Sequence, residues 1–151
     1  MEDQTTTHSL DETIALGRRF AARLGVGDCV ALDGPLGAGK TQFARGVALG
    51  LGLDDGRMVR SPTFVLMQEY PARVPIYHLD AYRLGDPQAE LIDLGFEEML
   101  ADGVVLLEWA ERAPSLLPEG TWHVTIEITG PTDRRFTIRR GGPESPAPPR
   151  G

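Results

Sequence analysis

The strongest constraint on the fold is the run GPLGAGKT from Gly34 to Thr41, which matches the pattern G-x-x-x-x-G-K-[ST]. A short apolar run, Cys29–Asp33, precedes it, and apolar residues at helical spacing follow it from Lys40 to about Leu51. A loop between a buried strand and a helix lets backbone N–H groups converge on phosphate oxygens at the helix N-terminus. We therefore expect an α/β fold that carries a nucleoside triphosphate site.

The last two residues of this loop have distinct expected roles. In a phosphate-binding loop the lysine bridges the β and γ phosphates and the hydroxyl ligates magnesium, which assigns these roles to Lys40 and Thr41. Lys40 is also the only lysine among 15 basic residues, and only a compact ammonium on a slim stem fits a narrow phosphate site. The expected nucleotide-contacting stretch is Gly34, Pro35, Leu36, Gly37, Ala38, Gly39, Lys40, Thr41 and Gln42.

Two carboxylates directly follow apolar strand-like runs. Asp80 ends the run Ile76–Asp80, and Glu108 ends Val104–Glu108. A carboxylate at the end of a neighbouring strand can hold a magnesium shell or orient the attacking water, and the pattern alone assigns neither role to either residue. His78 shares a strand face with Asp80, and a lone histidine there is more often a structural hydrogen-bonding group than a ligand.

The choice of nucleotide follows by elimination. Guanine-specific GTPases need a D-x-x-G switch and an N-K-x-D base-reading motif. This chain has no D-x-x-G, no asparagine and no second lysine. We therefore expect ATP with Mg²⁺ as the ligand.

The remaining pattern predicts a mixed β-sheet flanked by helices. Ser9 and Glu12 form a capping box at the start of a helix over residues 10–24. Further expected elements are strands over 65–70, 76–80 and 104–107, a helical segment over 86–102 broken at Gly95, and an antiparallel hairpin of 122–128 with 135–139 at one edge of the sheet. We expect one domain over residues 1–140 and a disordered Pro/Gly-rich tail over 141–151.

Composition sets limits on partners and location. The chain has 151 residues and a net charge of −7, which gives no wide basic surface that would attract nucleic acid by itself. No apolar run approaches the length of a membrane span, so we expect a cytoplasmic protein without a membrane contact. Cys29 is the only cysteine and is expected to be a core residue.

Four signatures in a fixed order give the chain a resemblance to a known family. They are the phosphate loop, Ser61-Pro62-Thr63-Phe64, His78-Leu79-Asp80-Ala81-Tyr82-Arg83-Leu84 and Leu107-Glu108-Trp109. With them, residues 9–128 resemble the TsaE (formerly YjeE) family. Pro35 and Ala81 depart from the family, which usually has an acidic or amide residue at the first position and a bulky apolar one at the second. Neither departure removes an expected ligand.

The resemblance implies a P-loop ATPase of the bacterial pathway that makes threonylcarbamoyladenosine in tRNA. It implies that ATP hydrolysis resets a complex of TsaD and TsaB between rounds, so that tRNA is met only indirectly through that complex. It also implies that Glu108 binds the magnesium shell, that Asp80 acts in hydrolysis, and that Ser61 and Thr63 belong to a switch loop near the γ-phosphate. Trp109 would be an aromatic residue beside the site.

Two other functions use the same loop. A small-molecule P-loop kinase would pass the phosphoryl group to an acceptor, but it needs an acceptor pocket and a lid, and little chain is left for them after Glu108. A nucleotide-dependent binding module would use ATP mainly as a structural switch.

Overall fold

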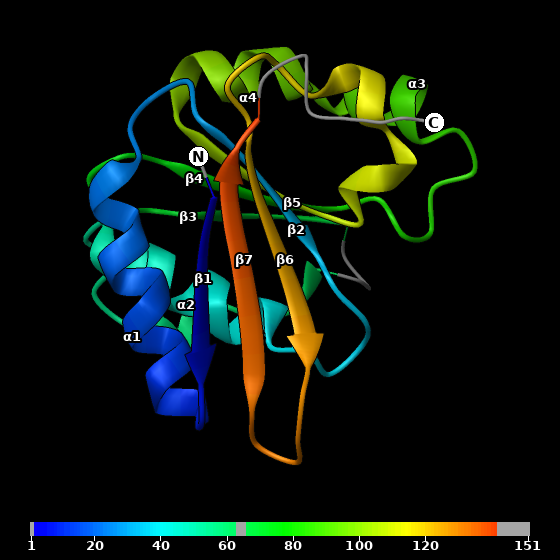
Figure 1. Ribbon diagram of the computed structural model, residues 1–151. Helices are drawn as coiled ribbons and strands as arrows, with labels where there is room; N and C mark the ends of the chain where they lie inside the picture. Colours follow the sequence, from blue (N-terminus) through cyan, green and yellow to red (C-terminus); the bar gives the residue numbers. More distant parts are fainter. Residues whose placement is uncertain (1, 63–65, 142–151) are drawn as a thin grey trace.

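The computed structural model describes residues 2–62 and 66–141 and shows a seven-stranded mixed sheet with helices on both faces (Figure 1). The strands are β1 (Glu2–Thr7), β2 (Cys29–Asp33), β3 (Met67–Tyr70), β4 (Ile76–Asp80), β5 (Val104–Glu108), β6 (Trp122–Ile128) and β7 (Arg134–Arg140). The α-helices are α1 (Leu10–Phe20), α2 (Lys40–Gly50), α3 (Pro87–Leu94) and α4 (Phe96–Asp102). Short 3-10 helices cover Ala21–Arg23, Gly56–Met58, Ala110–Arg112 and Pro114–Leu116.

The strand order is β1-β7-β6-β2-β5-β4-β3. The four central strands β6, β2, β5 and β4 are parallel, whereas β7, β1 and β3 continue the sheet by antiparallel pairing. In the register of the parallel strands, Leu32 pairs with Glu108 and Glu108 pairs with Asp80. The carboxyl ends of β2, β5 and β4 therefore meet at one edge, which is where open α/β sheets bind their ligands.

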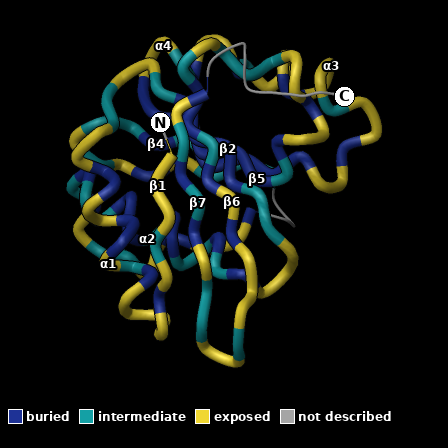
Figure 2. Tube along the Cα trace, viewed as in Figure 1, coloured by how far each residue is buried: buried dark blue, intermediate teal, exposed yellow. Residues whose placement is uncertain are grey.

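The sheet separates two apolar cores. One core packs α1 and α2 against one face, and the other packs α3 and α4 against the opposite face. Alternate residues of β2 divide between them, since Val30 and Leu32 belong to the first core and Cys29 and Ala31 to the second. Figure 2 shows the central strands buried and the turn between β6 and β7 exposed. Burial on both faces explains why the central strands are continuously apolar rather than alternating.

Glycines bring α1 and α2 into close contact. A Cβ atom on Gly17 would lie 2.3 Å from the Phe43 carbonyl oxygen, and one on Gly46 would lie 2.1 Å from that of Ile14. At these points the two helix backbones approach too closely for any side chain. This contact holds α2, the helix that follows the phosphate loop, in a fixed position on the sheet.

The N-terminal strand and the place of the hairpin differ from the expectations. Residues 2–7 read as a polar, acidic segment, yet they form β1, an edge strand that pairs only with β7. Its outer edge and most of its side chains are exposed, so its sequence needs no apolar alternation. The hairpin of β6 and β7 exists, but the prediction that it lies at the edge was wrong, because β1 covers β7 and β6 pairs with β2.

Several local expectations are confirmed. Ser9 caps α1 by accepting the Glu12 N–H at 3.1 Å, although the Glu12 carboxylate accepts from the N–H of His8 rather than that of Ser9. Gly95 has φ of +99° and separates α3 from α4. Burial raises the pKa of the Cys29 thiol to about 12, as suits a core residue.

The C-terminal tail was expected to begin at residue 141. Gly141 is buried, and its N–H donates to the Thr121 carbonyl at 2.7 Å. The rest of the expected tail, residues 142–151, lies outside the described residues.

The contact between α1 and α2 generates a stability prediction. Changing Gly46→Ala should lower the free energy of unfolding by about 1–3 kcal/mol, because the new methyl group overpacks against the Ile14 carbonyl. Gly25→Ala is the matched control, since a Cβ there meets nothing within 4 Å and should change stability by less than about 0.5 kcal/mol. Urea unfolding followed by circular dichroism measures both variants. Equal stability of the two would contradict the close packing of the helices.

Candidate nucleotide-binding site

The phosphate loop connects the buried end of β2 to the first turn of α2. Gly37 has φ of +80° and Gly39 has φ of +107°, which are left-handed conformations that favour glycine. Gly39 caps α2, and its carbonyl accepts the Phe43 N–H at 2.9 Å. The N–H groups of the first helical turn have no partner within the helix, so they can donate to an anion in front of it.

Lys40 lies across the mouth of this loop and is only 6% exposed. Its Nζ donates to the Gly34 carbonyl at 2.5 Å and lies 4.4 Å from the centroid of the Trp109 ring. A carbonyl oxygen and an aromatic face both attract a cation, so these contacts hold the ammonium group at the helix N-terminus. Lys40 thus places a positive charge where the loop would bind an anion.

A cavity of about 320 Å³ opens in front of the loop. It brings together most of the residues that the sequence predicted, namely Leu36, Gly37, Ala38, Gly39, Lys40, Thr41, Gln42, Ser61, Glu108 and Trp109. Gly34, Pro35 and Asp80 do not line it, and Thr63 lies outside the described residues. Leu10 from the start of α1 does line it, which sequence reasoning missed because only the packing of α1 against α2 brings this residue there.

The two predicted carboxylates are neighbours across β4 and β5. Asp80 and Glu108 are register partners, and each is 2% exposed. One oxygen of Asp80, Oδ1, accepts the N–H of Tyr82 at 2.7 Å, which ties the carboxylate to the turn that follows β4. Glu108 Oε2 lies 2.7 Å from His78 Nε2. Since only Glu108 lines the cavity, it is the carboxylate closer to a bound phosphate.

The donor set suits magnesium only with help from a phosphate. In residues 2–62 and 66–141 no three His, Cys, Asp or Glu side chains come together as a metal cluster. Mg²⁺ in phosphate-binding proteins commonly uses one or two protein oxygens and takes its other ligands from substrate phosphates and water. The Thr41 hydroxyl and the Glu108 carboxylate, both on the cavity wall, fit that pattern.

An aromatic pair closes one side of the cavity. Trp109 follows β5 with φ of +60°, a left-handed conformation that costs a non-glycine residue about 1–2 kcal/mol. The ring of Tyr82 packs on it at 4.8 Å between centroids, and Arg112 donates from its guanidinium group to the carbonyls of Tyr82 and Leu84. These contacts hold Trp109 in position over Lys40.

A second pair of acids, which sequence reasoning missed, lies behind the loop. Asp33 ends β2, and its Oδ1 atom is buried without a hydrogen-bond partner among the described residues. Burial and the neighbouring Glu111 carboxyl raise the pKa of Asp33 to about 8, although the charge of Lys40 acts in the opposite direction. Burial and Glu111 therefore favour the protonated form of Asp33. The only available signal was an acid directly before the loop.

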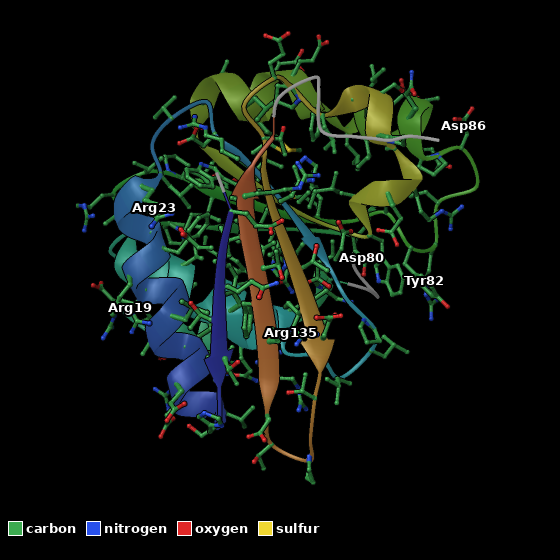
Figure 3. All side chains as sticks on the ribbon, viewed as in Figure 1. Arg19, Arg23, Asp80, Tyr82, Asp86 and Arg135 are labelled. Atoms are coloured by element: carbon green, nitrogen blue, oxygen red, sulfur yellow. The ribbon has the colours of Figure 1, made fainter. Side chains whose placement is uncertain are left out.

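A second cavity, of about 370 Å³, adjoins the first. Both cavities are lined by Leu10, Gly37 and Gly39, and the second is also lined by Pro131 and Arg134. Arg134 in addition holds the phosphate loop by donating to the Gly37 carbonyl at 3.2 Å. A third cavity lies between β1 and α1, beside the Arg19 and Arg23 labelled in Figure 3, and contains no residue of the phosphate loop.

None of the helices described is long and apolar enough to span a membrane.

Comparison with known proteins places this site in a family. The family model described as threonylcarbamoyl adenosine biosynthesis protein TsaE matches residues 7–136. The tRNA threonylcarbamoyladenosine biosynthesis protein TsaE of Bacillus subtilis is 41% identical over 134 residues, which are 87% of this chain and 82% of that protein. The protein of the same name from Treponema pallidum is 37% identical over 133 residues, covering 87% of this chain and 96% of the relative.

A solved structure agrees with the sequence relatives. The crystal structure of Bacillus subtilis YdiB superposes with a TM-score of 0.75 at 32% sequence identity, covering 94% of this chain and 87% of YdiB. The agreement extends over the whole sheet and is not limited to the phosphate loop that many proteins share. The chain belongs to the TsaE family.

Proposed function

We propose that this protein binds and hydrolyses ATP with Mg²⁺ in the synthesis of tRNA threonylcarbamoyladenosine, and that hydrolysis resets a complex of TsaD and TsaB between rounds. The observation that carries the proposal is the convergence of Lys40, Thr41 and Glu108 on one cavity in a chain of the TsaE family. The reaction takes place in the cytoplasm. With a net charge of −7 the chain has little attraction for tRNA by itself, so it meets tRNA through its partners.

The phosphates lie along the loop. The N–H groups at the start of α2 bind the β-phosphate, and Lys40 leaves the Gly34 carbonyl to bridge the β and γ oxygens. Ser61, which also lines the cavity, belongs to the loop that contacts the γ-phosphate. Thr63 has the same proposed role from the same loop. Charge neutralisation by Lys40 and Mg²⁺ is the main catalytic contribution, since phosphoryl transfer depends on positioning and electrostatics.

The Thr41 hydroxyl and, through water, the Glu108 carboxylate would hold the magnesium ion. Mg²⁺ supplies Lewis-acid stabilisation of the charge that develops on the phosphate oxygens. Asp80, the register partner of Glu108, orients the attacking water. Because Asp80 is also tied to the Tyr82 N–H, a shift of the turn after β4 changes the direction of its second oxygen.

The base of the nucleotide occupies the second cavity. That cavity shares Leu10, Gly37 and Gly39 with the phosphate cavity, so one ligand can extend through both. Leu10 and Pro131 offer apolar contacts to the faces of a planar ring. The Trp109 ring lies on the phosphate side beside Lys40 and does not contact the base.

A small-molecule kinase is the alternative function. It needs a lid that closes over an acceptor. Between Glu108 and β6 the chain forms two short 3-10 helices, Ala110–Arg112 and Pro114–Leu116. Arg112 donates to backbone carbonyls of the turn that follows β4. This segment is a packed part of the fold rather than a lid, which favours water as the acceptor.

Removal of the Lys40 charge tests the proposal in the complete reaction. With TsaB, TsaD, a threonylcarbamoyl donor, ATP and tRNA, the wild-type protein should raise the yield well above one product per TsaD. Lys40→Ala should reduce the stimulated rate by about a hundredfold, because it removes a preorganised charge from the transition state. Modified nucleoside is measured after digestion of the tRNA.

Arg57→Ala is the matched control, because Arg57 is exposed and its ion pair with Asp55 lies within the same turn. It should stimulate like the wild type. If the protein binds ATP but neither the wild type nor any variant changes the yield, the role in tRNA modification is wrong.

Trp109 should report nucleotide binding directly. The chain has two tryptophans, and only Trp109 contacts the Lys40 ammonium, at 4.4 Å from the ring centroid. Adding ATP and Mg²⁺ should change the tryptophan emission by about 10% or more, because phosphate draws the cation away from the ring. Trp109→Phe should abolish the change, whereas Trp122, which packs against Phe20 at 5.2 Å, should contribute none. Calorimetric binding of ATP without any emission change would show that Lys40 stays on Trp109.

A further inference from the structure

A buried polar chain runs from Glu108 away from the nucleotide cavity. Glu108 Oε2 lies 2.7 Å from His78 Nε2, and His78 Nδ1 lies 2.8 Å from the Tyr70 hydroxyl. The same hydroxyl lies 2.6 Å from Gln68 Oε1 and 3.3 Å from the Arg60 carbonyl oxygen. His78 is fully buried and Glu108 is 2% exposed. Bulk water therefore cannot replace a contact that is lost from this chain.

The sheet register builds this chain. Strands β5, β4 and β3 are neighbours, and Gln68 pairs with His78. His78 stands two residues before Asp80 on β4, and Asp80 pairs with Glu108 on β5. The side chains of His78 and Glu108 therefore project from the same face of the sheet. Their neighbours on that face, Ile76 and Leu106, are fully buried and apolar. A carboxylate beside such a layer needs a hydrogen-bond donor, because an unpaired buried charge is costly.

The number of available protons determines which group donates in each hydrogen bond between Glu108, His78 and Tyr70. A tyrosine hydroxyl carries one proton, and a neutral imidazole carries one. The Tyr70 hydroxyl donates to Gln68 Oε1 at 2.6 Å, an oxygen that can only accept, so this proton is not available to His78 Nδ1. A lone pair of Nε2 facing a carboxylate would be repulsive. An ionised Glu108 therefore requires a proton on His78 Nε2, while the Tyr70 hydroxyl, 2.8 Å from Nδ1, holds the other side of the ring.

In this arrangement His78 donates to Glu108 Oε2 and leaves the other oxygen of the carboxylate for a ligand. Metal-binding groups are commonly oriented by such outer hydrogen bonds, whose loss typically costs about 10–100-fold in metal affinity or activity. Tyr70 in turn contacts the Arg60 carbonyl, one residue before Ser61. The orientation of Glu108 is thus linked to the segment that carries Ser61, another residue of the cavity wall.

We propose that His78 is a positioning residue that aims the Glu108 carboxylate at the magnesium shell, and that Tyr70 fixes the His78 ring for this purpose. The inference rests on the proposed function, in which Glu108 serves that shell. His78 itself contacts neither the nucleotide nor the metal.

The test is a calorimetric titration of ATP at a series of Mg²⁺ concentrations, which gives the Mg²⁺ concentration for half-maximal enhancement of binding. His78→Leu should raise this concentration about 10–100-fold. His78→Gln should restore most of the loss, because its amide N–H group can occupy the place of Nε2–H. Tyr70→Phe, which removes only the hydroxyl, should give a smaller rise of about threefold to tenfold. His123→Gln, on β6, is the control and should behave like the wild type.

ATP affinity in the presence of EDTA is the second readout. It should stay within about twofold of the wild type in every variant, whereas damage to the fold would lower it together with the Mg²⁺ response. An unchanged Mg²⁺ requirement in His78→Leu, or an equal loss with and without Mg²⁺, would overturn the positioning role while leaving the proposed function intact. Failure of the wild type to bind ATP at any Mg²⁺ concentration would overturn the proposed function and this assignment together.

The tautomer gives an independent measurement without nucleotide. The chain has three histidines, so ¹⁵N-labelled imidazole spectra can be assigned with His8 and His123 variants. His78 should carry a proton on Nε2, and Tyr70→Phe should shift the Nδ1 resonance, because it removes the hydroxyl 2.8 Å from that atom. An Nε2 atom without a proton in the wild type would overturn the proposal.

Discussion

The pairing of β2 with β5 and of β5 with β4 brings the start of the phosphate loop and the two carboxylates Asp80 and Glu108 to one edge of the sheet. Since Leu32 stands opposite Glu108 and Glu108 opposite Asp80, the phosphate loop leaves the sheet beside both carboxylates. Figure 3 shows Asp80 and Tyr82 on the side of the molecule where β2 ends. The tight backbone contact of α1 with α2 then fixes the direction of the helix whose N-terminus faces the cavity.

Electrostatic balance is the main difficulty of this site, because acidic groups surround a place for a polyanion. Lys40 and Arg134 supply positive charge at the loop, whereas Asp33, Asp80, Glu108 and Glu111 are four acids at or close to it. The structure reduces their repulsion locally. Burial and Glu111 raise the pKa of Asp33, which disfavours its charged form, and Glu108 accepts a hydrogen bond from His78. In the proposed function, a bound Mg²⁺ would supply further positive charge.

The sequence predicted features that local chemistry encodes. Positional signatures mark the loop glycines, the Ser9 cap and the break at Gly95. The continuous apolar runs of β2 and β5 predict burial on both faces of the sheet. Features that depend on distant pairing were missed. The strand β1 has no apolar alternation because it pairs along one edge only, and Leu10 reaches the cavity only through helix packing.

The roles within the site follow the same division. Lys40, Thr41 and Glu108 could be predicted from motifs to lie together, and they line one cavity, whereas no motif indicates that His78 bridges Glu108 and Tyr70 on three different strands. A crystal structure with a non-hydrolysable ATP analogue and Mg²⁺ tests the account most directly. The account predicts phosphates at the start of α2, magnesium between Thr41 and Glu108, and the base beside Leu10 and Pro131. Phosphates held elsewhere, or magnesium bound without Thr41 and Glu108, would contradict it.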